Sequence, residues 1–213
     1  MVDLNLLFDA ILHGKHKDAA ALTQAAIEEN IEPKELIDNY LIKAMEEIGA
    51  QFEKQQVFVP ELLMAGRAMK ASLSLLQPLL KGDEATSDLG TVVIGTVKGD
   101  LHDIGKNLVA SMFEGCGFTI VDLGVDVDAA KFVQAVKDNN ANIVSLSALL
   151  TTTMPYMKTV INTLESEGLR SSVKVMVGGA PVSQSFASEI GADGYSDSAN
   201  SAIIKAKELL GVA

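Results

Sequence analysis

Three side chains that can bind a metal or move a proton stand close together in the segment "GTVKGDLHDIGKNLV", residues 95–109. Asp100, His102 and Asp103 follow an apolar run typical of a strand, and Gly105 opens a pattern typical of a helix. A neutral imidazole binds a metal through one ring nitrogen, while the other nitrogen needs an oriented acceptor such as a carboxylate. The spacing therefore predicts a site in which Asp100 orients His102 as a single axial ligand.

Other interpretations of this loop are weaker, and one stays open. A phosphate-binding loop has four residues between its glycines and then Lys-Ser or Lys-Thr. Here five residues separate Gly99 from Gly105, and Asn107 takes the hydroxyl position. Zinc needs three or four protein ligands, and His13 and His16 lie far away in the chain. A histidine that only caps the helix or satisfies the loop is still possible from these residues alone.

The composition is that of a globular protein with an acidic surface. The chain has 213 residues, of which 48% are hydrophobic and 21% charged, with a net charge of −11. This charge disfavours a nucleic-acid-binding face. Cys116 is the only cysteine and is expected to be a small buried apolar residue, which fits a reducing compartment. No leader peptide and no membrane span is expected, so the sequence predicts a cytoplasmic protein.

The first 80 residues show only helical periodicity. In "KELIDNYLIKAMEEIGAQFE", apolar residues recur at steps of three and four, which indicates an amphipathic helix over 34–53. Pro60 stands at an expected first helical position. We therefore predict a cap bundle of four helices in residues 1–80, with helices over 2–13, 16–29, 34–53 and 60–80. The polar, aperiodic segment 81–90 predicts a linker and a domain boundary.

Residues 91–213 alternate between short, wholly apolar runs and helical patterns. Apolar runs of this kind indicate parallel strands that are buried on both faces. The expected strands are 90–97, 118–124, 142–148, 173–179 and 193–196. The expected helices are 104–115, 128–138, 153–167, 182–190 and one that ends near residue 210. The prediction is a doubly wound α/β domain with a flavodoxin-like, parallel five-stranded sheet.

Ligands bind such sheets at the carboxyl ends of the strands. The loop after the expected strand 90–97, which carries His102, lies there, and so do two further sets of small or polar residues. Hydroxyl residues follow the third strand, and a pair of glycines follows the fourth. These residues are Ser147, Thr151, Thr152, Thr153, Gly178 and Gly179. The glycines can let a bulky cofactor approach the backbone.

Several motifs together resemble a known family. "GDLHDIGKNLV" resembles the Asp-x-His-x-x-Gly signature of the cobalamin-binding domains of methyltransferases and mutases. "SAL" at 147–149 and "VGGAPV" at 177–182 resemble that family's Ser-x-Leu and Gly-Gly elements, in its order and spacing. "FEKQQVFVPELLMAGRAM" at 52–69 resembles the helical cap of cobalamin-dependent methionine synthase and of stand-alone methyltransferase corrinoid proteins.

The resemblance implies roles for individual residues. His102 is the axial ligand to cobalt beneath a cobalamin or related corrinoid, Asp100 hydrogen-bonds His102, and Thr153 takes a relay position that is often Ser in the family. Phe52 and Val59 match cap positions that shield the reactive cobalt ligand, although both also suit a bundle core. Cofactor contacts are further implied for Gly99, Leu101, Asp103, Ile104, Gly105, Ser147, Leu149, Thr151, Gly178 and Gly179.

The resemblance also implies a function as a methyl carrier. Cob(I)alamin accepts a methyl group from a donor held by a substrate-specific methyltransferase, and methyl-cob(III)alamin passes it to a second methyltransferase with a thiol (coenzyme M-type) or tetrahydrofolate acceptor. A reductive activator protein is a third expected partner. The chemistry requires these partners, so whether the chain alone is an enzyme stays open. The methyl donor also stays open among methylamines, methanol, betaines and methoxyaromatics.

Three rival functions follow from the same residues. The cobalamin-binding subunit of a mutase shares the histidine signature, but the cap resembles methyl-transfer proteins. A cobalamin-sensing regulator would need a basic DNA-binding helix, for which the sequence has no candidate. A flavin-binding electron carrier fits the fold but does not explain a histidine in this loop. The methyl carrier is the function that the sequence favours.

Overall fold

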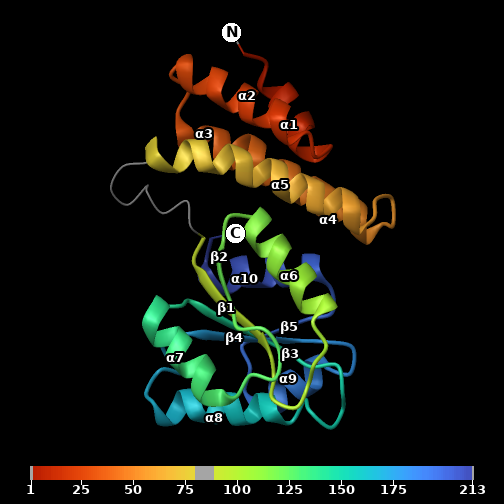
Figure 1. Cartoon of the computed structure of the whole chain (residues 1–213), viewed down its shortest axis with the longest axis vertical. Helices are drawn as coiled ribbons and strands as arrows, with labels where there is room; N and C mark the ends of the chain where they lie inside the picture. Colours follow the sequence, from red (N-terminus) through yellow and green to blue (C-terminus); the bar gives the residue numbers. More distant parts are fainter. Residues whose placement is uncertain (1, 80–88, 213) are drawn as a thin grey trace. The chain divides into compact units, whose positions relative to one another are not determined.

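The computed structural model describes residues 2–79 and 89–212 (Figure 1). The predicted linker, 81–90, therefore lies outside the described residues except for Leu89 and Gly90. The chain forms two compact units, one of residues 1–88 with 111–117 and the other of residues 89–110 with 118–213. By element order, we call the elements from α1 to η2 the helical unit and the elements from β1 to α10, with the whole of α6, the α/β unit, and we describe each by itself.

The helical unit contains the four helices that periodicity predicted. The predicted helix 34–53 is one continuous rod in which a π-helical turn separates two α-helical parts. This π-turn has no signal in the pattern of apolar residues. Pro60 is the second residue of its helix rather than the first. The elements are α1 (Leu4–Leu12), α2 (His16–Glu28), α3 (Pro33–Leu36), η1 (Ile37–Leu41), α4 (Ile42–Glu53), α5 (Val59–Leu76) and η2 (Gln77–Leu79).

Apolar residues at helical spacing form the core of the helical unit. Leu36, Leu41 and Ile48 of the long rod are at most 1% exposed, and they are the residues that the three- and four-residue steps predicted. One polar pair is buried with them. The hydroxyl groups of Thr23 on α2 and Ser72 on α5 lie 2.9 Å apart and hydrogen-bond each other, and the Thr23 hydroxyl also donates to the carbonyl oxygen of Ala19 at 2.8 Å.

The α/β unit contains one five-stranded sheet with the order β2-β1-β3-β4-β5. Every neighbouring pair is parallel, so the predicted flavodoxin-like, doubly wound fold is confirmed. The strands are β1 (Thr91–Thr96), β2 (Thr119–Asp122), β3 (Ile143–Ser147), β4 (Lys174–Gly178) and β5 (Gly194–Ser196). The helices are α6 (Ile104–Gly115), α7 (Ala129–Asn139), α8 (Tyr156–Ser166), α9 (Gln184–Ile190) and α10 (Ala199–Leu210).

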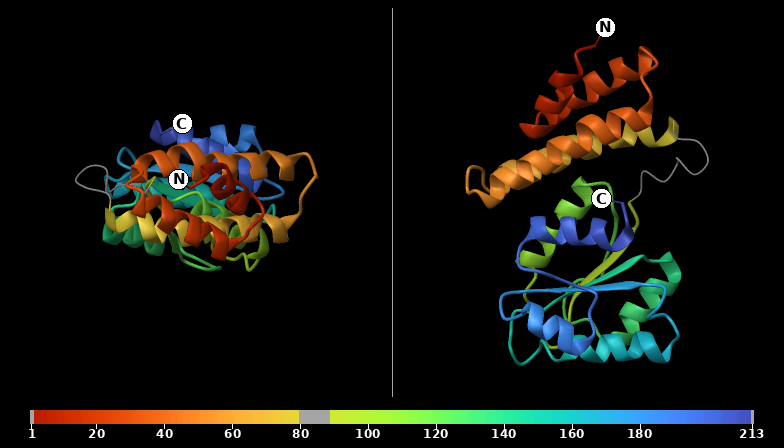
Figure 2. Two further views of the ribbon diagram at one scale, coloured as in Figure 1. Left: turned by 90° about the horizontal axis from the view of Figure 1, so that it is seen from above. Right: turned by 180° about the vertical axis from the view of Figure 1, so that it is seen from behind.

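Helices cover both faces of this sheet. Figures 1 and 2 show α7, α8 and α9 on one face and α6 and α10 on the other. Val93, Val144 and Val175 pack in the core beneath α7, α8 and α9, whereas their strand neighbours Val92 and Ile143 are equally buried outside that cluster. Because successive strand residues point to opposite faces, this double burial explains the uninterrupted apolar runs in the sequence.

One predicted helix begins later than expected. The helical pattern predicted a helix over 153–167, but α8 begins at Tyr156 and residues 151–155 form a turn. Pro155 disfavours the α conformation at the residue before it, so the helix does not extend back to Thr153. Thr153 is therefore a loop residue, which places its hydroxyl among the loops at the carboxyl ends of the strands.

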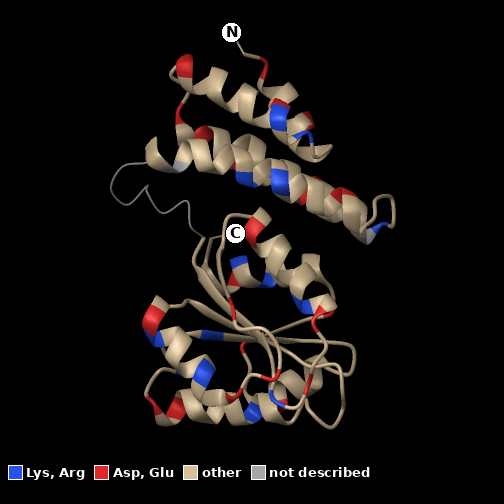
Figure 3. Cartoon of the chain, viewed as in Figure 1, with Lys and Arg blue, Asp and Glu red and all other residues tan. Residues whose placement is uncertain are grey.

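Charged residues are distributed over both units. In Figure 3, acidic and basic residues both occur on the helices, and several loops of the α/β unit carry acidic residues. The excess of acidic residues agrees with the net charge of −11. Among the described residues, no helix combines the length and the apolar character that crossing a membrane requires.

Candidate functional site

Two loops from neighbouring strands meet at the carboxyl end of the sheet. The loop between β1 and α6 carries Asp100 and His102, and the loop between β3 and α8 carries Thr153. Because β1 and β3 are adjacent and parallel, residues that lie 53 positions apart in the chain reach hydrogen-bond distance. The sheet order therefore brings together the three residues that the sequence predicted as catalytic.

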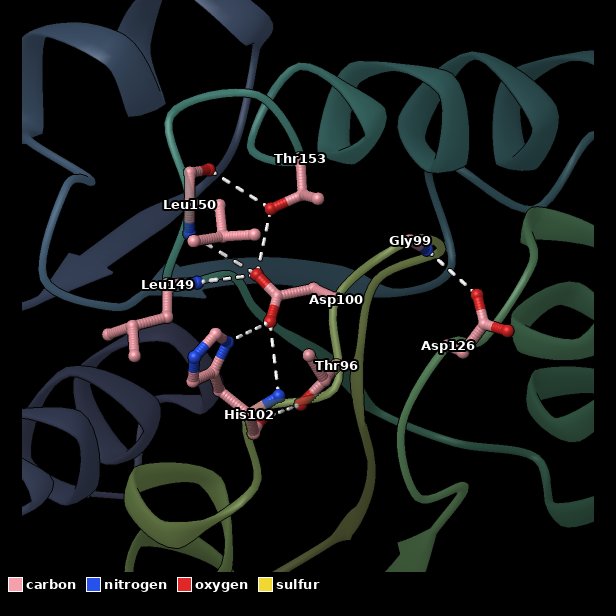
Figure 4. Close-up of polar contacts among 8 residues, drawn as sticks. All are labelled: Thr96, Gly99, Asp100, His102, Asp126, Leu149, Leu150 and Thr153. Carbon is pink, nitrogen blue, oxygen red and sulfur yellow. Dashed lines mark hydrogen bonds and ion pairs between the residues drawn. The ribbon is translucent and has the colours of Figure 1, made fainter.

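The Asp100 carboxylate is fully buried and accepts five hydrogen bonds (Figure 4). Its Oδ1 accepts from the His102 amide at 3.1 Å and pairs with His102 Nδ1 at 2.6 Å. Its Oδ2 accepts from the amides of Leu149 at 2.8 Å and Leu150 at 3.3 Å, and from the Thr153 hydroxyl at 2.7 Å. Such a set of donors suits a charged carboxylate.

These donors keep Asp100 ionised. Burial alone raises the pKa of the carboxyl group, because it disfavours the charged form. The hydrogen bonds from the Leu149 amide, the His102 ring and the Thr153 hydroxyl outweigh burial and hold the pKa of Asp100 well below its usual range. A carboxylate that is ionised throughout the working range can only accept, and it dictates the position of the proton on its imidazole partner.

The Asp100 carboxylate thus assigns the tautomer of His102. Nδ1 must carry a hydrogen and donate it to Oδ1, so the lone pair of the neutral ring lies on Nε2. Figure 4 shows Nδ1 turned toward Asp100 and the other ring nitrogen turned away. Within residues 2–79 and 89–212, Nε2 has no hydrogen-bond partner, and the side chain is 50% exposed. His102 therefore presents a basic nitrogen to whatever binds above the loop.

Nε2 is the His102 nitrogen that is left for a ligand. Because Oδ2 of Asp100 already accepts three hydrogen bonds, a proton on that oxygen would displace a donor. Asp100 is therefore fixed as a charged acceptor for Nδ1, and Nε2 is the ring nitrogen that can bind a metal.

The surroundings of His102 suit a large, mostly apolar ligand. Leu101 is 71% and Ile104 is 86% exposed, although both are apolar, and the exposed Leu149 and Leu150 lie on the facing loop. Exposed apolar residues that cluster around a polar group mark binding sites. A Cβ built on Gly105 meets no atom of the described chain within 4 Å, so the space beside it is open. These features fit a large ligand with apolar parts that lies beside His102.

The predicted Gly-Gly element has a role in the fold itself. Gly179 has a φ of +126°, and a Cβ there would lie 1.9 Å from the carbonyl oxygen of Ala148. A Cβ on Gly178 would lie 3.1 Å from the carbonyl oxygen of Ser196. Gly179 is thus required where the end of β4 passes its neighbour, whereas the space at Gly178 is only tight. The contact of both glycines with a cofactor stays a prediction.

Other predicted site residues make no hydrogen bond with the Asp100 side chain. Ser147 ends β3 half-buried, Thr151 is exposed in the turn, and Asp103 accepts from the Asn107 side chain at 3.2 Å. In the helical unit, Phe52 is half-buried near the end of α4. Val59 is 36% exposed at the start of α5, which disfavours its alternative as a core residue. Contacts of these residues with a cofactor, including the shielding by Phe52 and Val59, stay predictions.

The structure adds three residues that sequence reasoning missed. Leu150 supplies a backbone amide, for which a sequence carries no signal. The buried Thr96 donates its hydroxyl to the carbonyl oxygen of His102 at 2.8 Å. Asp126, between β2 and α7, accepts from the Gly99 amide at 2.8 Å. An aspartate directly after an expected strand could have drawn attention to this last contact.

Comparisons with known proteins identify the family. A model described as B12 binding domain matches residues 90–204, and a second model with that description matches residues 4–77. "Dimethylamine corrinoid protein 2" of Methanosarcina mazei is 45% identical over 204 residues, which is 96% of this chain and 95% of that protein. The chain belongs to the B12-binding corrinoid proteins. The resemblance in the sequence and the predicted cofactor, cobalamin or a related corrinoid, are thereby confirmed.

Solved structures agree with this family. A cobalamin-binding protein from Desulfitobacterium hafniense DCB-2 is 32% identical with a TM-score of 0.80, covering 98% of this chain and 99% of that chain. A chain of the methanol:cobalamin methyltransferase complex MtaBC from Methanosarcina barkeri is 31% identical with a TM-score of 0.82, covering 99% of this chain and 80% of that chain. This corrinoid protein thus resembles components of methyltransferase systems along its whole length.

Proposed function

We propose that this corrinoid protein carries a methyl group from a substrate-specific methyltransferase to a second methyltransferase, with His102 as the exchangeable protein ligand of the corrinoid. When bound, the corrinoid supplies a cobalt ion that accepts and releases the methyl group. The observation that carries the proposal is the Asp100 carboxylate, which leaves His102 Nε2 open and basic. The proposal includes the predicted domains, which are a cap of residues 1–80, a linker of residues 81–90 and a cofactor domain of residues 91–213.

In this proposal, the residues around His102 have separate tasks. Asp100 keeps the proton on Nδ1, and Thr153 with the two backbone amides keeps Asp100 charged. With the ring hydrogen held on Nδ1, Nε2 of His102 would be the atom that binds the cobalt ion of the corrinoid. The exposed Leu101 and Ile104 exclude water from the apolar ligand.

The partner methyltransferase selects the methyl donor in this proposal. Two similar proteins carry different substrates in their names, dimethylamine and methanol, and both align with nearly the whole of this chain. Because the same architecture occurs with both substrates, it does not determine the methyl donor. We propose a methylamine as the first donor to test, because identity is 45% to the dimethylamine corrinoid protein and 31% to the methanol complex. Two further partners complete the proposed system. One is a second methyltransferase with a thiol or tetrahydrofolate acceptor, and the other is a reductive activator protein.

Electron paramagnetic resonance of the cobalt(II) form tests the ligand. The spectrum should show coupling to one nitrogen of the protein, and labelling histidine with nitrogen-15 should change the splitting. His102→Gly should abolish the coupling, whereas the control His16→Ala, at an exposed position in the helical unit, should retain it. A splitting that labelling leaves unchanged contradicts the assignment of His102.

A transfer assay tests the carrier role. The reduced, corrinoid-loaded protein is mixed with a dimethylamine or methanol methyltransferase and its substrate, and the absorption spectrum is followed. We expect methylation with a methylamine system and, after addition of a methyl-accepting enzyme, return of the starting spectrum. Failure with every methylamine and methanol system, with His102 ligation intact, would reject the proposed donor classes.

A further inference from the structure

A second loop holds the backbone next to Asp100 from the opposite side. Asp126 lies between β2 and α7, and its Oδ1 accepts from the Gly99 amide at 2.8 Å (Figure 4). The amide of Asp126 in turn donates to the carbonyl oxygen of Asp100 at 3.0 Å. One residue therefore grips two consecutive residues of the ligand loop, once through its side chain and once through its backbone. We call these two hydrogen bonds the Asp126 clamp.

The Asp126 clamp acts where the direction of the Asp100 side chain is decided. Gly99 has a φ of +84°, so the chain turns sharply just before Asp100. The amide of Asp100 donates to Val97 at 3.1 Å, and its carbonyl accepts from Asp126, so both of its backbone polar groups are fixed. A shift of this backbone would move the carboxylate away from the donors on the β3–α8 loop, and His102 with it.

The backbone conformation of Asp126 would suit glycine better than aspartate, which indicates a role for the aspartate side chain. Its φ is +53°, a region that non-glycine residues avoid at a cost of about 1 kcal/mol or more. Glycine would adopt this conformation freely, and asparagine or aspartate tolerates it best among other residues. Asp126 is also exposed and does not cap α7, because Asp128 accepts from the Lys131 amide as its N-cap. The acceptor oxygen toward Gly99 is the feature that a glycine would lack.

We infer that Asp126 is a positioning residue for the corrinoid ligand, which holds Asp100 in place and through Asp100 fixes the tautomer of His102. This inference rests on the proposed function, since it assigns a supporting role to the same ligand pair. It predicts that the acceptor on residue 126, rather than its negative charge, is required. Aspartate and asparagine should therefore be equivalent here, and glycine should not.

Two substitutions separate the acceptor from the charge. Asp126→Asn keeps an acceptor and tolerates a positive φ, whereas Asp126→Gly keeps the conformation and the backbone hydrogen bond to Asp100 but loses the side-chain acceptor for Gly99. Asn140→Gly is the matched control, because Asn140 also has a positive φ of 47° but lies at the far end of α7. The two glycine variants relieve the strain of a positive φ, and Asp126→Asn retains a residue that tolerates it. All three variants are therefore expected to fold, which circular dichroism checks.

The first measurements use the protein without corrinoid. Hydrogen exchange of the Gly99 amide should become about tenfold faster in Asp126→Gly, because its acceptor is gone. Nitrogen-15 shifts of the His102 ring should show hydrogen on Nδ1 in the wild type and a mixture of tautomers in Asp126→Gly. Asp126→Asn and Asn140→Gly should match the wild type in both measurements. A Gly99 amide that stays protected, or a ring that keeps its tautomer, in Asp126→Gly overturns the inference.

The second measurement uses protein loaded with cobalamin. Nitrogen coupling gives the fraction of cobalt(II) that His102 coordinates, and from it the equilibrium constant for coordination. This constant should fall roughly tenfold in Asp126→Gly and stay unchanged in Asp126→Asn. An equal loss in both variants overturns the role of the acceptor in favour of charge. If no form of the protein coordinates cobalt through His102, the proposed function fails, while exchange at Gly99 and the His102 tautomer still decide whether the clamp works.

Discussion

Substituting Asp100 by asparagine tests how the buried carboxylate controls its ligand. An asparagine has the same shape but only one acceptor oxygen, with an NH₂ group in place of the other. In one orientation the NH₂ group faces the Leu149 and Leu150 amides and leaves two buried donors unpaired, at about 1–3 kcal/mol each. In the other it faces His102 and leaves one backbone amide unpaired. The second orientation is favoured by about 1–3 kcal/mol.

The favoured orientation reverses the histidine tautomer. The asparagine NH₂ group can only donate, so Nδ1 of His102 must accept and the ring hydrogen moves to Nε2. Ligation then requires the ring to return to the disfavoured tautomer. Changes in such supporting partners reduce metal affinity about 10- to 100-fold, which corresponds to roughly 1.4–2.7 kcal/mol. We expect a loss of this size in cobalt coordination by His102, while cobalamin itself stays bound through its other contacts.

The assay compares nitrogen coupling in the cobalt(II) spectrum with the nitrogen-15 shifts of the His102 ring in the cofactor-free protein. Asp128→Asn is the matched control, because it makes the same chemical change at an exposed N-cap where asparagine serves equally well. Its spectra should equal those of the wild type. If Asp100→Asn coordinates cobalt within twofold of the wild type and keeps hydrogen on Nδ1, then Asp100 does not set the tautomer and the reasoning is refuted.

Further changes test other parts of the site. Thr153→Val should weaken cobalt coordination by His102 several-fold in the same spectrum, whereas Thr153→Ser, which keeps the hydroxyl, should not. Gly179→Ala should lower the free energy of urea unfolding by about 2 kcal/mol or more, because its φ is +126° and its Cβ would meet Ala148. Gly105→Ala should leave that free energy unchanged or higher but weaken cobalamin binding in titrations, since only open space surrounds its Cβ. The folded-state pKa of Asp100 is lowered, so its contribution to stability is complete above the ordinary aspartate pKa of about 4 and is lost only as the pH falls below that value. The difference in free energy of urea unfolding between wild type and Asp100→Asn should therefore stay constant from about pH 7 to pH 5 and shrink below about pH 4.

The features that the sequence predicts correctly depend on local patterns. Wholly apolar runs separated by helical periods indicate a parallel sheet, because only strands covered on both faces have no polar side. The Asp100–His102 pair is also local, since two residues separated by one position on a tight loop can meet without any knowledge of the fold. The predicted start of α8 at Thr153 was wrong, because Pro155 disfavours the α conformation at the residue before it and the helix begins only at Tyr156.

The features that the sequence does not predict depend on backbone groups and on contacts across the sheet. The Leu149 and Leu150 amides help to keep Asp100 charged, and their side chains carry no trace of this. The contact of Asp126 with Gly99 spans 27 positions and requires the order β2-β1-β3. Periodicity identifies strands but does not order them, so neither contact could be placed before the fold was known.

The position of the ligand pair in this sheet has a physical reason. β1 is an interior strand, flanked by β2 on one side and β3 on the other, so groups from the loops of two neighbouring strands can reach the loop after it. The β3 side supplies donors to the Asp100 carboxylate, and the β2 side grips the Asp100 backbone through Asp126. A buried carboxylate is stable only with such a complete set of partners, and an edge strand could offer partners from one side alone. His102 can thus be half exposed and exchangeable while the group that orients it stays buried and fixed.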